Sequence, residues 1–156
     1  MVSVRDAVPD DVATRHVDRD AWEDLYVVGD VHGCLPALER LLARLDPDED
    51  DLVVFVGDLT RKGPDSAGVV ELVRSRDNFL SVRGNNEEKL LRGEKDLAEL
   101  DERDMAYVES LPVVITWDGA AVLHGGLDPS KPVSEHSQEE LQNIAELDDG
   151  FWWESY

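Results

Sequence analysis

The sequence predicts an α/β domain built on a parallel sheet. Three short apolar runs are each followed closely by a glycine and a polar side chain: residues 25–28, 52–56 and 79–82. The polar residues Asp30, Asp58 and Asn85 lie 28 and 27 residues apart, close to the length of one βαβ unit. Strands that are apolar throughout and alternate with helices are typical of a parallel sheet covered on both faces. We therefore expect a βαβαβ arrangement in the N-terminal half of the chain.

Helical patterns fill the two segments between these runs. Leucines recur at helical spacing over residues 35–45, and Pro36 suits the first turn of a helix. Apolar residues over 69–73 predict a second helix, with Asp65 or Ser66 placed to cap its start.

The region after Asn85 predicts mixed structure. Two further helices are expected over residues 86–91 and 105–111. Asp118-Gly119 lies between two apolar runs, which is a strong hairpin signal. Ser137 followed by Glu140 forms a capping box, so a helix should begin there and run towards Leu147.

The chain is strongly acidic, with 36 Asp and Glu against 15 Lys and Arg and a net charge of -21 over 156 residues. Such a surface repels phosphate backbones and anionic lipids, so we expect neither nucleic-acid nor membrane binding. Carboxylates are spread along the whole chain, Asp outnumbers Glu and Arg outnumbers Lys. This combination is typical of a halophilic, salt-accumulating host, and an acidic protein of a mesophile is the alternative. Cys34 is the sole cysteine, no apolar run is long enough to span a membrane, and no signal pattern follows Met1. A cytoplasmic protein is expected, and nothing in the sequence sets an oligomeric state.

Metal-competent side chains follow the predicted strands. Asp30, Asp58 and Asn85 each come after a glycine at a strand end, where parallel sheets place their ligands. His32 is two residues beyond Asp30, and His124 precedes two glycines after the last apolar run. A lone Gly-Asp is usually a turn and a lone histidine usually structural, but together these groups converge on one edge. Carboxylates brought so close repel unless a cation lies between them, and mixed Asp, Asn and His donors suit manganese, iron or zinc better than calcium.

Four motifs in this order resemble those of the calcineurin-like metallophosphoesterases: residues 29–33 (Gly-Asp-Val-His-Gly), 57–58 (Gly-Asp), 84–87 (Gly-Asn-Asn-Glu) and 124–126 (His-Gly-Gly). Residues 57–66 look most like bacterial phosphoprotein phosphatases and diadenosine tetraphosphatases. The resemblance implies a metallophosphatase-type β-sandwich flanked by helices, of which this chain holds a part. Residues 25–156 would form this domain with its C-terminal part missing, after an irregular N-terminal arm over residues 1–24.

The resemblance also implies a set of ligands and a reaction. Asp30, His32 and Asp58 would hold one divalent metal ion. Asp58 would bridge to a second ion, held also by Asn85 and His124. Manganese is favoured, with iron or zinc as alternatives. The implied reaction of this phosphoric ester hydrolase is metal-dependent hydrolysis of a phosphate ester or anhydride, in a phosphorylated protein or a nucleotide polyphosphate.

The three candidate catalytic residues, Arg61, Lys62 and Asn86, depart from the family pattern. The family usually has Asp-Arg-Gly where this chain has Arg61, Lys62 and Gly63, so Lys62 offers a point charge at the phosphate-binding arginine position. Asn86 stands where the family has the histidine that protonates the leaving group, and an amide cannot transfer that proton. A later Gly-His motif of the family is absent from this sequence. The alternative is therefore a catalytically weak metal- or phosphate-binding module or fragment.

Other polar side chains are expected to have structural roles. Arg83, directly before the Gly-Asn pair, should form an ion pair. His16 and His136 should be solvated or bonded locally. Cys34 has no adjacent base, so a nucleophilic role is not expected.

Overall fold

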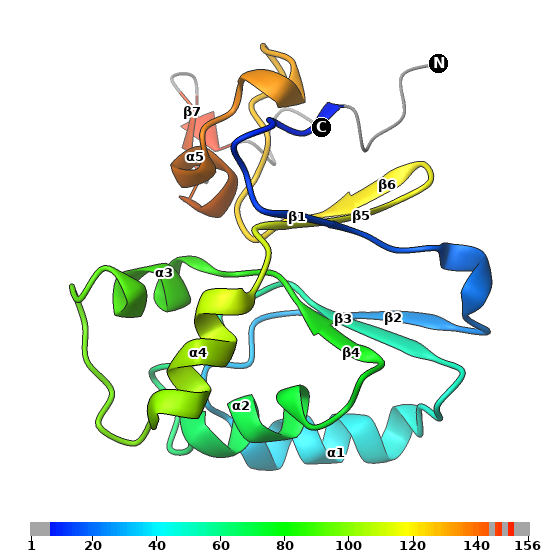
Figure 1. The fold of residues 1–156 in the computed structure, drawn as a ribbon, viewed down its shortest axis with the longest axis vertical. Helices are drawn as coiled ribbons and strands as arrows, with labels where there is room; N and C mark the ends of the chain where they lie inside the picture. The colour runs from blue at the N-terminus through cyan, green and yellow to red at the C-terminus, as the bar shows by residue number, and fades with distance from the viewer. Residues whose placement is uncertain (1–6, 144–145, 148–149, 152–156) are drawn as a thin grey trace.

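The computed structural model describes residues 7–143, 146–147 and 150–151. The start of the expected N-terminal arm (residues 1–24) and part of the C-terminal end of the expected domain (residues 25–156) therefore lie outside the described residues. Two three-stranded sheets pack face to face, and helices cover the outer face of one of them (Figure 1). The predicted α/β fold is confirmed. Within the described part of the chain, no helix has both the length and the apolarity needed to cross a membrane.

The first sheet has the order β2-β3-β4, and all its strands are parallel: β2 (Leu25–Val28), β3 (Leu52–Phe55) and β4 (Phe79–Ser81). The central strand β3 is buried along its whole length, because the sheet is covered on both faces. This burial explains why its sequence is apolar at every position instead of alternating. The three predicted strands are confirmed.

Helices α1 (Leu35–Leu45) and α2 (Ser66–Arg74) make the two crossovers and lie along one face of this sheet (Figure 1). Their buried side chains join those of the sheet in one cluster, which includes Leu38, Leu42, Val53, Phe55, Val69, Val73 and Phe79. Of the two candidate caps for α2, Asp65 is the N-cap, and its side chain accepts a hydrogen bond from the Gly68 N–H at 2.7 Å. The expected βαβαβ arrangement is therefore present.

The second sheet has the order β1-β5-β6: β1 (Thr14–His16), β5 (Val114–Trp117) and β6 (Ala120–Val122). Strands β5 and β6 form the predicted antiparallel hairpin, and Gly119 in its turn has φ +82°. The two sheets enclose a second apolar cluster with Leu52, Val54, Leu80, Val82, Ile115 and Val122.

The N-terminal arm differs from the expectation of irregular structure. Thr14–His16 pairs in parallel with β5, and a 3-10 helix follows at Arg19–Ala21. All three residues of β1 are exposed, so no apolar alternation marks this strand in the sequence. It pairs with the edge of β5 that β6 does not occupy.

The remaining helices are α3 (Asn85–Leu91), α4 (Glu102–Ser110) and α5 (Gln138–Asn143), with a 3-10 helix at Val133–Glu135. The Ser137 capping box is confirmed, since the Glu140 carboxylate accepts from the Ser137 N–H at 2.7 Å. The helix does not continue to Leu147 as expected. Glu146–Leu147 instead forms β7, which pairs with β8 (Gly150–Phe151).

Candidate metal centre

The loops that follow β2 and β3 are joined by hydrogen bonds through the Asp58 carbonyl. It accepts from the N–H groups of Val31 at 3.1 Å and His32 at 2.8 Å. Both His32 and Asp58 have φ +52°, a left-handed conformation that is costly for a residue other than glycine. Strain of this kind persists only where the surroundings enforce it, and it is common at functional sites.

The side chains of Asp30, His32 and Asp58 meet beyond the strand ends, with one ligand atom of each within 4.8 Å of the others. His32 Nε2 lies 3.4 Å from Asp30 Oδ2 and 3.7 Å from Asp58 Oδ2. The Asp58 side chain is 5% exposed and the Asp30 side chain 45% exposed. The cluster is therefore open to solvent on the Asp30 side and closed on the Asp58 side.

His124 approaches the other oxygen of the same aspartate. Its Nε2 lies 3.4 Å from Asp58 Oδ1, and its Nδ1 lies 2.8 Å from the Val56 carbonyl oxygen. A carbonyl can only accept, so we assign the imidazole proton to Nδ1. Nε2 then presents a lone pair to a carboxylate oxygen, an arrangement that is repulsive unless a proton or a metal ion lies between them.

Asp58 thus stands between two imidazoles, with Oδ2 towards His32 and Oδ1 towards His124. Together with Asp30, these groups provide carboxylate oxygens and imidazole nitrogens, the donor set that manganese, iron and zinc accept. The residues present therefore fit divalent metal ions.

Asn86 is only 4% exposed and holds the Asp58 carboxylate in place. Its backbone N–H donates to Asp58 Oδ1 at 2.9 Å, and its side-chain amide donates to Asp58 Oδ2. The amide oxygen in turn accepts from Arg61 Nη1. Two of the three residues predicted to be catalytic, Arg61 and Asn86, are therefore in direct contact, and Asn86 links a guanidinium to the centre.

Lys62, the third candidate catalytic residue, points at the same cluster. Its Nζ lies 3.2 Å from His32 Nε2, although the residue as a whole is exposed. Arg61 and Lys62 have φ +68° and +73°, so two successive cations sit on left-handed backbone. This turn directs both side chains to the edge of the sheet that carries the metal-competent groups.

Asn85 is the first residue of α3 and is half-buried. It follows Gly84, whose backbone lies so close to Asp58 that an added Cβ would be 2.3 Å from Asp58 Oδ1. Among the described residues, Asn85 makes no side-chain hydrogen bond to the cluster. Its role as a metal ligand stays a prediction.

Glu87, for which the sequence predicts no role, is fully buried and bonded to the backbone of Asp58. Its carboxylate accepts from the backbone N–H groups of Asp58, Thr60 and Gly84 and from the Thr60 hydroxyl. Burial, followed by the charge of Asp58, raises the pKa of Glu87 above its ordinary value. A glutamate three residues after the glycine that begins a helix is the one signal that could have indicated it.

The remaining structural assignments agree with expectation. Arg83 Nη1 lies 3.2 Å from Glu88 Oε2, which confirms the ion pair. His136 is buried and bonded locally, its Nε2 accepting from the Asp128 N–H at 2.8 Å. His16 Nδ1 lies 3.1 Å from Thr116 Oγ1.

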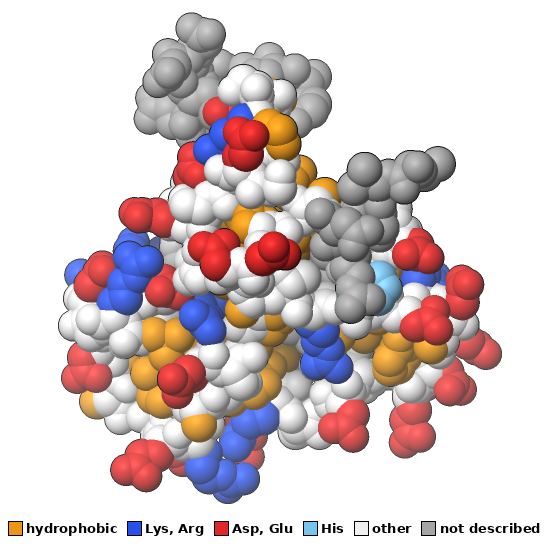
Figure 2. Space-filling model, turned by 45° about the horizontal axis from the view of Figure 1, so that its top comes forward, with side chains coloured by type: hydrophobic (Ala, Val, Ile, Leu, Met, Phe, Trp, Pro, Cys, Tyr) orange, Lys and Arg blue, Asp and Glu red, His pale blue; other side chains and the backbone are white. Residues whose placement is uncertain are grey.

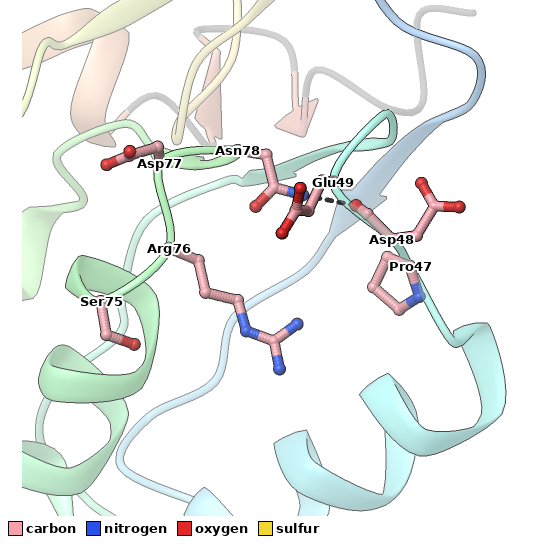
Figure 3. A pocket seen from close by; sticks show the side chains of 7 residues that line it. All are labelled: Pro47, Asp48, Glu49, Ser75, Arg76, Asp77 and Asn78. Atoms are coloured by element: carbon pink, nitrogen blue, oxygen red, sulfur yellow. Dashed lines mark hydrogen bonds between the residues drawn. The ribbon is translucent and has the colours of Figure 1, made fainter.

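A separate hollow lies at the opposite ends of the strands, between the segments that precede β3 and β4 (Figure 3). The Asn78 amide joins its two sides by donating to the carbonyls of Asp48 at 2.8 Å and Asp51 at 2.7 Å. The Arg76 guanidinium lies 4.9 Å from the centre of the Phe79 ring. These contacts explain the polar lining as a junction between two loops, remote from the metal-competent cluster.

Charge is dispersed on the face of the molecule that Figure 2 shows. On the face shown in Figure 2, acidic side chains are scattered, with Lys and Arg between them. This agrees with the even distribution of carboxylates along the sequence.

Comparison with known proteins gives the same family at several levels. The family model described as Calcineurin-like phosphoesterase matches residues 24–155. Serine/threonine-protein phosphatase 1 of Salmonella typhimurium is 41% identical over 85 residues, which cover 53% of this chain and 38% of that protein. The symmetrical bis(5'-nucleosyl)-tetraphosphatase of Aromatoleum aromaticum is 33% identical over 123 residues, covering 67% of this chain and 45% of that protein. The matched segments thus span less than half the length of these relatives.

Solved structures indicate the same family. A crystal structure provisionally described as a diadenosine tetraphosphatase superposes with a TM-score of 0.78 at 32% identity, covering 88% of this chain and 65% of that one. A protein serine/threonine phosphatase from Saccharomyces cerevisiae, at 22% identity and a TM-score of 0.59, shares the fold over 85% of this chain and 46% of that one. From its fold, its strand-end cluster and these matches, the chain belongs to the calcineurin-like phosphoesterase family.

Proposed function

We propose that this chain hydrolyses a phosphate ester or phosphoanhydride with two divalent metal ions bound around Asp58. The observation that carries the proposal is the position of Asp58, whose two oxygens lie 3.7 Å from His32 Nε2 and 3.4 Å from His124 Nε2. A carboxylate with one oxygen towards each of two ligand groups is suited to bridge two cations. Asp30 would complete the site beside His32, and Asn85 the site beside His124.

Bound ions at these positions would supply Lewis acidity at the phosphoryl group and lower the pKa of a water molecule. Manganese suits this mixed donor set best, with iron or zinc as alternatives. The protein's own contribution is to hold the ligands apart and in place before the substrate arrives. Asn86 does this for Asp58 through two hydrogen bonds.

Lys62 and Arg61 would bind the phosphoryl oxygens of the substrate. Lys62 lies beside His32 and Arg61 beside Asn86, in a chain whose net charge is -21. A phosphate group is therefore drawn to this edge and repelled by the remaining surface. Arg61, fixed to Asn86, offers the better-defined position of the two.

The leaving group would depart without a proton from Asn86. An amide can donate a hydrogen bond to the departing oxygen but cannot transfer a proton to it near neutral pH. Leaving groups that are stable as anions should therefore react best. This favours aryl phosphates and phosphoanhydrides over phosphoserine, and among the relatives' substrates it favours a dinucleoside polyphosphate over a phosphoprotein.

A catalytically weak metal- or phosphate-binding module is the second candidate function. Asn86 in the acid position favours it. Activity separates the two candidates, while both expect metal binding.

The test measures phosphate release from an aryl phosphate, a dinucleoside tetraphosphate and a phosphoserine peptide, with and without Mn²⁺. Asp58→Asn removes the bridging charge. Asp118→Asn is the matched control, because Asp118 is exposed in the β5–β6 turn and Asn-Gly suits a hairpin turn as well as Asp-Gly does. Mn²⁺-dependent turnover in the parent and control but not in Asp58→Asn is expected. No turnover above the metal-free rate on any of the three substrates would reject the hydrolase and leave the binding module.

A further inference from the structure

Glu87 is the buried carboxylate nearest to the metal-competent cluster that is not itself part of it. It is 0% exposed, and both its oxygens are used. Oε2 accepts from Asp58 N at 2.7 Å and Gly84 N at 3.0 Å, and Oε1 accepts from Thr60 N at 3.0 Å and Thr60 Oγ1 at 2.8 Å. A buried carboxylate is tolerated only when its acceptor capacity is filled in this way.

These bonds tie the loop after β3 to the first turn of α3. The two segments approach closely, since a Cβ added to Gly57 would lie 2.6 Å from the Gly84 nitrogen. No side chain can fill that gap, so their relative position depends on hydrogen bonds. Glu87 is bonded to the backbone of both segments.

The peptide units around Asp58 are therefore fixed at two points. Its N–H donates to Glu87, and its carbonyl accepts from Val31 and His32. Asp58 keeps φ +52° under this constraint. Any rotation of the Asp58 backbone would move its carboxylate and also the loop that carries His32.

We infer that Glu87 is a positioning residue of the centre, because it sets the Asp58 backbone so that the Asp58 carboxylate meets both His32 and His124. The inference deepens the proposed function and relies on it only for the statement that Asp58 binds a cation. Glu87 does not touch a metal ion or the substrate. It acts through Asp58.

The main test variant is Glu87→Gln, which keeps the shape but replaces one acceptor oxygen with an amide donor. The partners of Glu87 are three backbone N–H groups, which can only donate, and the Thr60 hydroxyl, which can also accept, so at least one backbone N–H must then face the amide group of Gln whichever way the side chain is turned. The control is Asp104→Asn, another buried carboxylate, which caps α4 by accepting from Asp101 N at 3.2 Å. Both variants should lose stability, but only the first should disturb the centre.

Binding of Mn²⁺ is measured by calorimetry well below the melting temperature of each variant. Loss of a group that orients a metal ligand typically weakens metal affinity about 10–100-fold. We expect a loss in that range for Glu87→Gln and less than about threefold for Asp104→Asn. Parental affinity in Glu87→Gln would overturn the inference.

Two further measurements decide the other cases. If Glu87→Gln does not fold, Thr60→Val removes one of the four bonds and should weaken Mn²⁺ binding by a smaller factor, whereas parental affinity would overturn the inference. If the parent protein binds no Mn²⁺, the proposed function fails. The positioning role is then tested by the NMR resonances of the His32 and His124 imidazoles in the metal-free protein. They should shift in Glu87→Gln and not in Asp104→Asn, and unshifted resonances would overturn the inference.

Discussion

Lys62 should oppose metal binding and favour phosphate binding, so replacing it should change the two affinities in opposite directions. Its Nζ lies 3.2 Å from His32 Nε2, the nitrogen that we assign to a metal ion. Lys62→Met keeps the length of the side chain and removes the charge. Metal affinity should rise, and phosphate affinity of the loaded protein should fall.

The size of the effect follows from the distance and the exposure. Two unit charges about 4 Å apart interact by about 1 kcal/mol in water, and a divalent ion doubles this to about 2 kcal/mol. Lys62 is exposed, so the stronger interaction of a buried pair does not apply. The flexible side chain can also turn away when the ion binds, which lowers the cost. We therefore expect Mn²⁺ to bind about 3–30-fold more tightly to Lys62→Met.

The assay is calorimetric titration with Mn²⁺, followed by inorganic phosphate as a competitive inhibitor. Lys95→Met is the control, because it removes the same charge from an exposed position outside the centre. The gain in Mn²⁺ affinity of Lys62→Met over the parent protein should also shrink as the potassium chloride concentration is raised, since salt screens exposed charges. Equal or weaker Mn²⁺ binding in Lys62→Met would refute the reasoning.

Two further predictions concern the leaving group and acid stability. Asn86→His should raise turnover of a phosphoserine peptide about 10²–10⁴-fold and that of an aryl phosphate much less, because only the poor leaving group needs a proton. An unchanged ratio of the two rates would show that another group supplies it. The Lys131 ammonium, followed by the Ser137 N–H, lowers the pKa of Glu140 to about 2, so this stabilisation is present above the ordinary pKa of 4.5 and is lost as the pH falls towards 2. Lys131→Gln should cost about 0.2–1 kcal/mol of unfolding free energy in urea at pH 7 and much less near pH 2, and an equal cost at both pH values would contradict the assignment.

The parallel sheet could be predicted because its strands are buried on both faces, which leaves continuous apolar runs in the sequence. Strand β1 could not. Thr14–His16 is exposed on all three residues, and its pairing with β5 joins positions 100 residues apart. The end of α5 was also missed, since the capping box marks where a helix begins and says nothing of where it ends.

The metal-competent side chains could be predicted because each follows a predicted strand closely in the sequence. Asp30, His32 and Asp58 were predicted to share one site, and the structure brings their ligand atoms together. The bonds that hold them were not predictable, because they join residues distant in sequence. Glu87 bonds Asp58 across 29 positions, and in the sequence it looks like any glutamate in a first helical turn.

The central claim is that Asp58 bridges two metal ions, and anomalous diffraction from crystals grown with Mn²⁺ tests it most directly. Two manganese peaks are expected about 3.5–4 Å apart, one on the His32 side of the carboxylate and one on the His124 side. Crystals of Asp58→Asn grown in the same way should lose both peaks or show both much reduced. A single peak in the parent protein, or one peak retained at full height in Asp58→Asn, would contradict the bridging role.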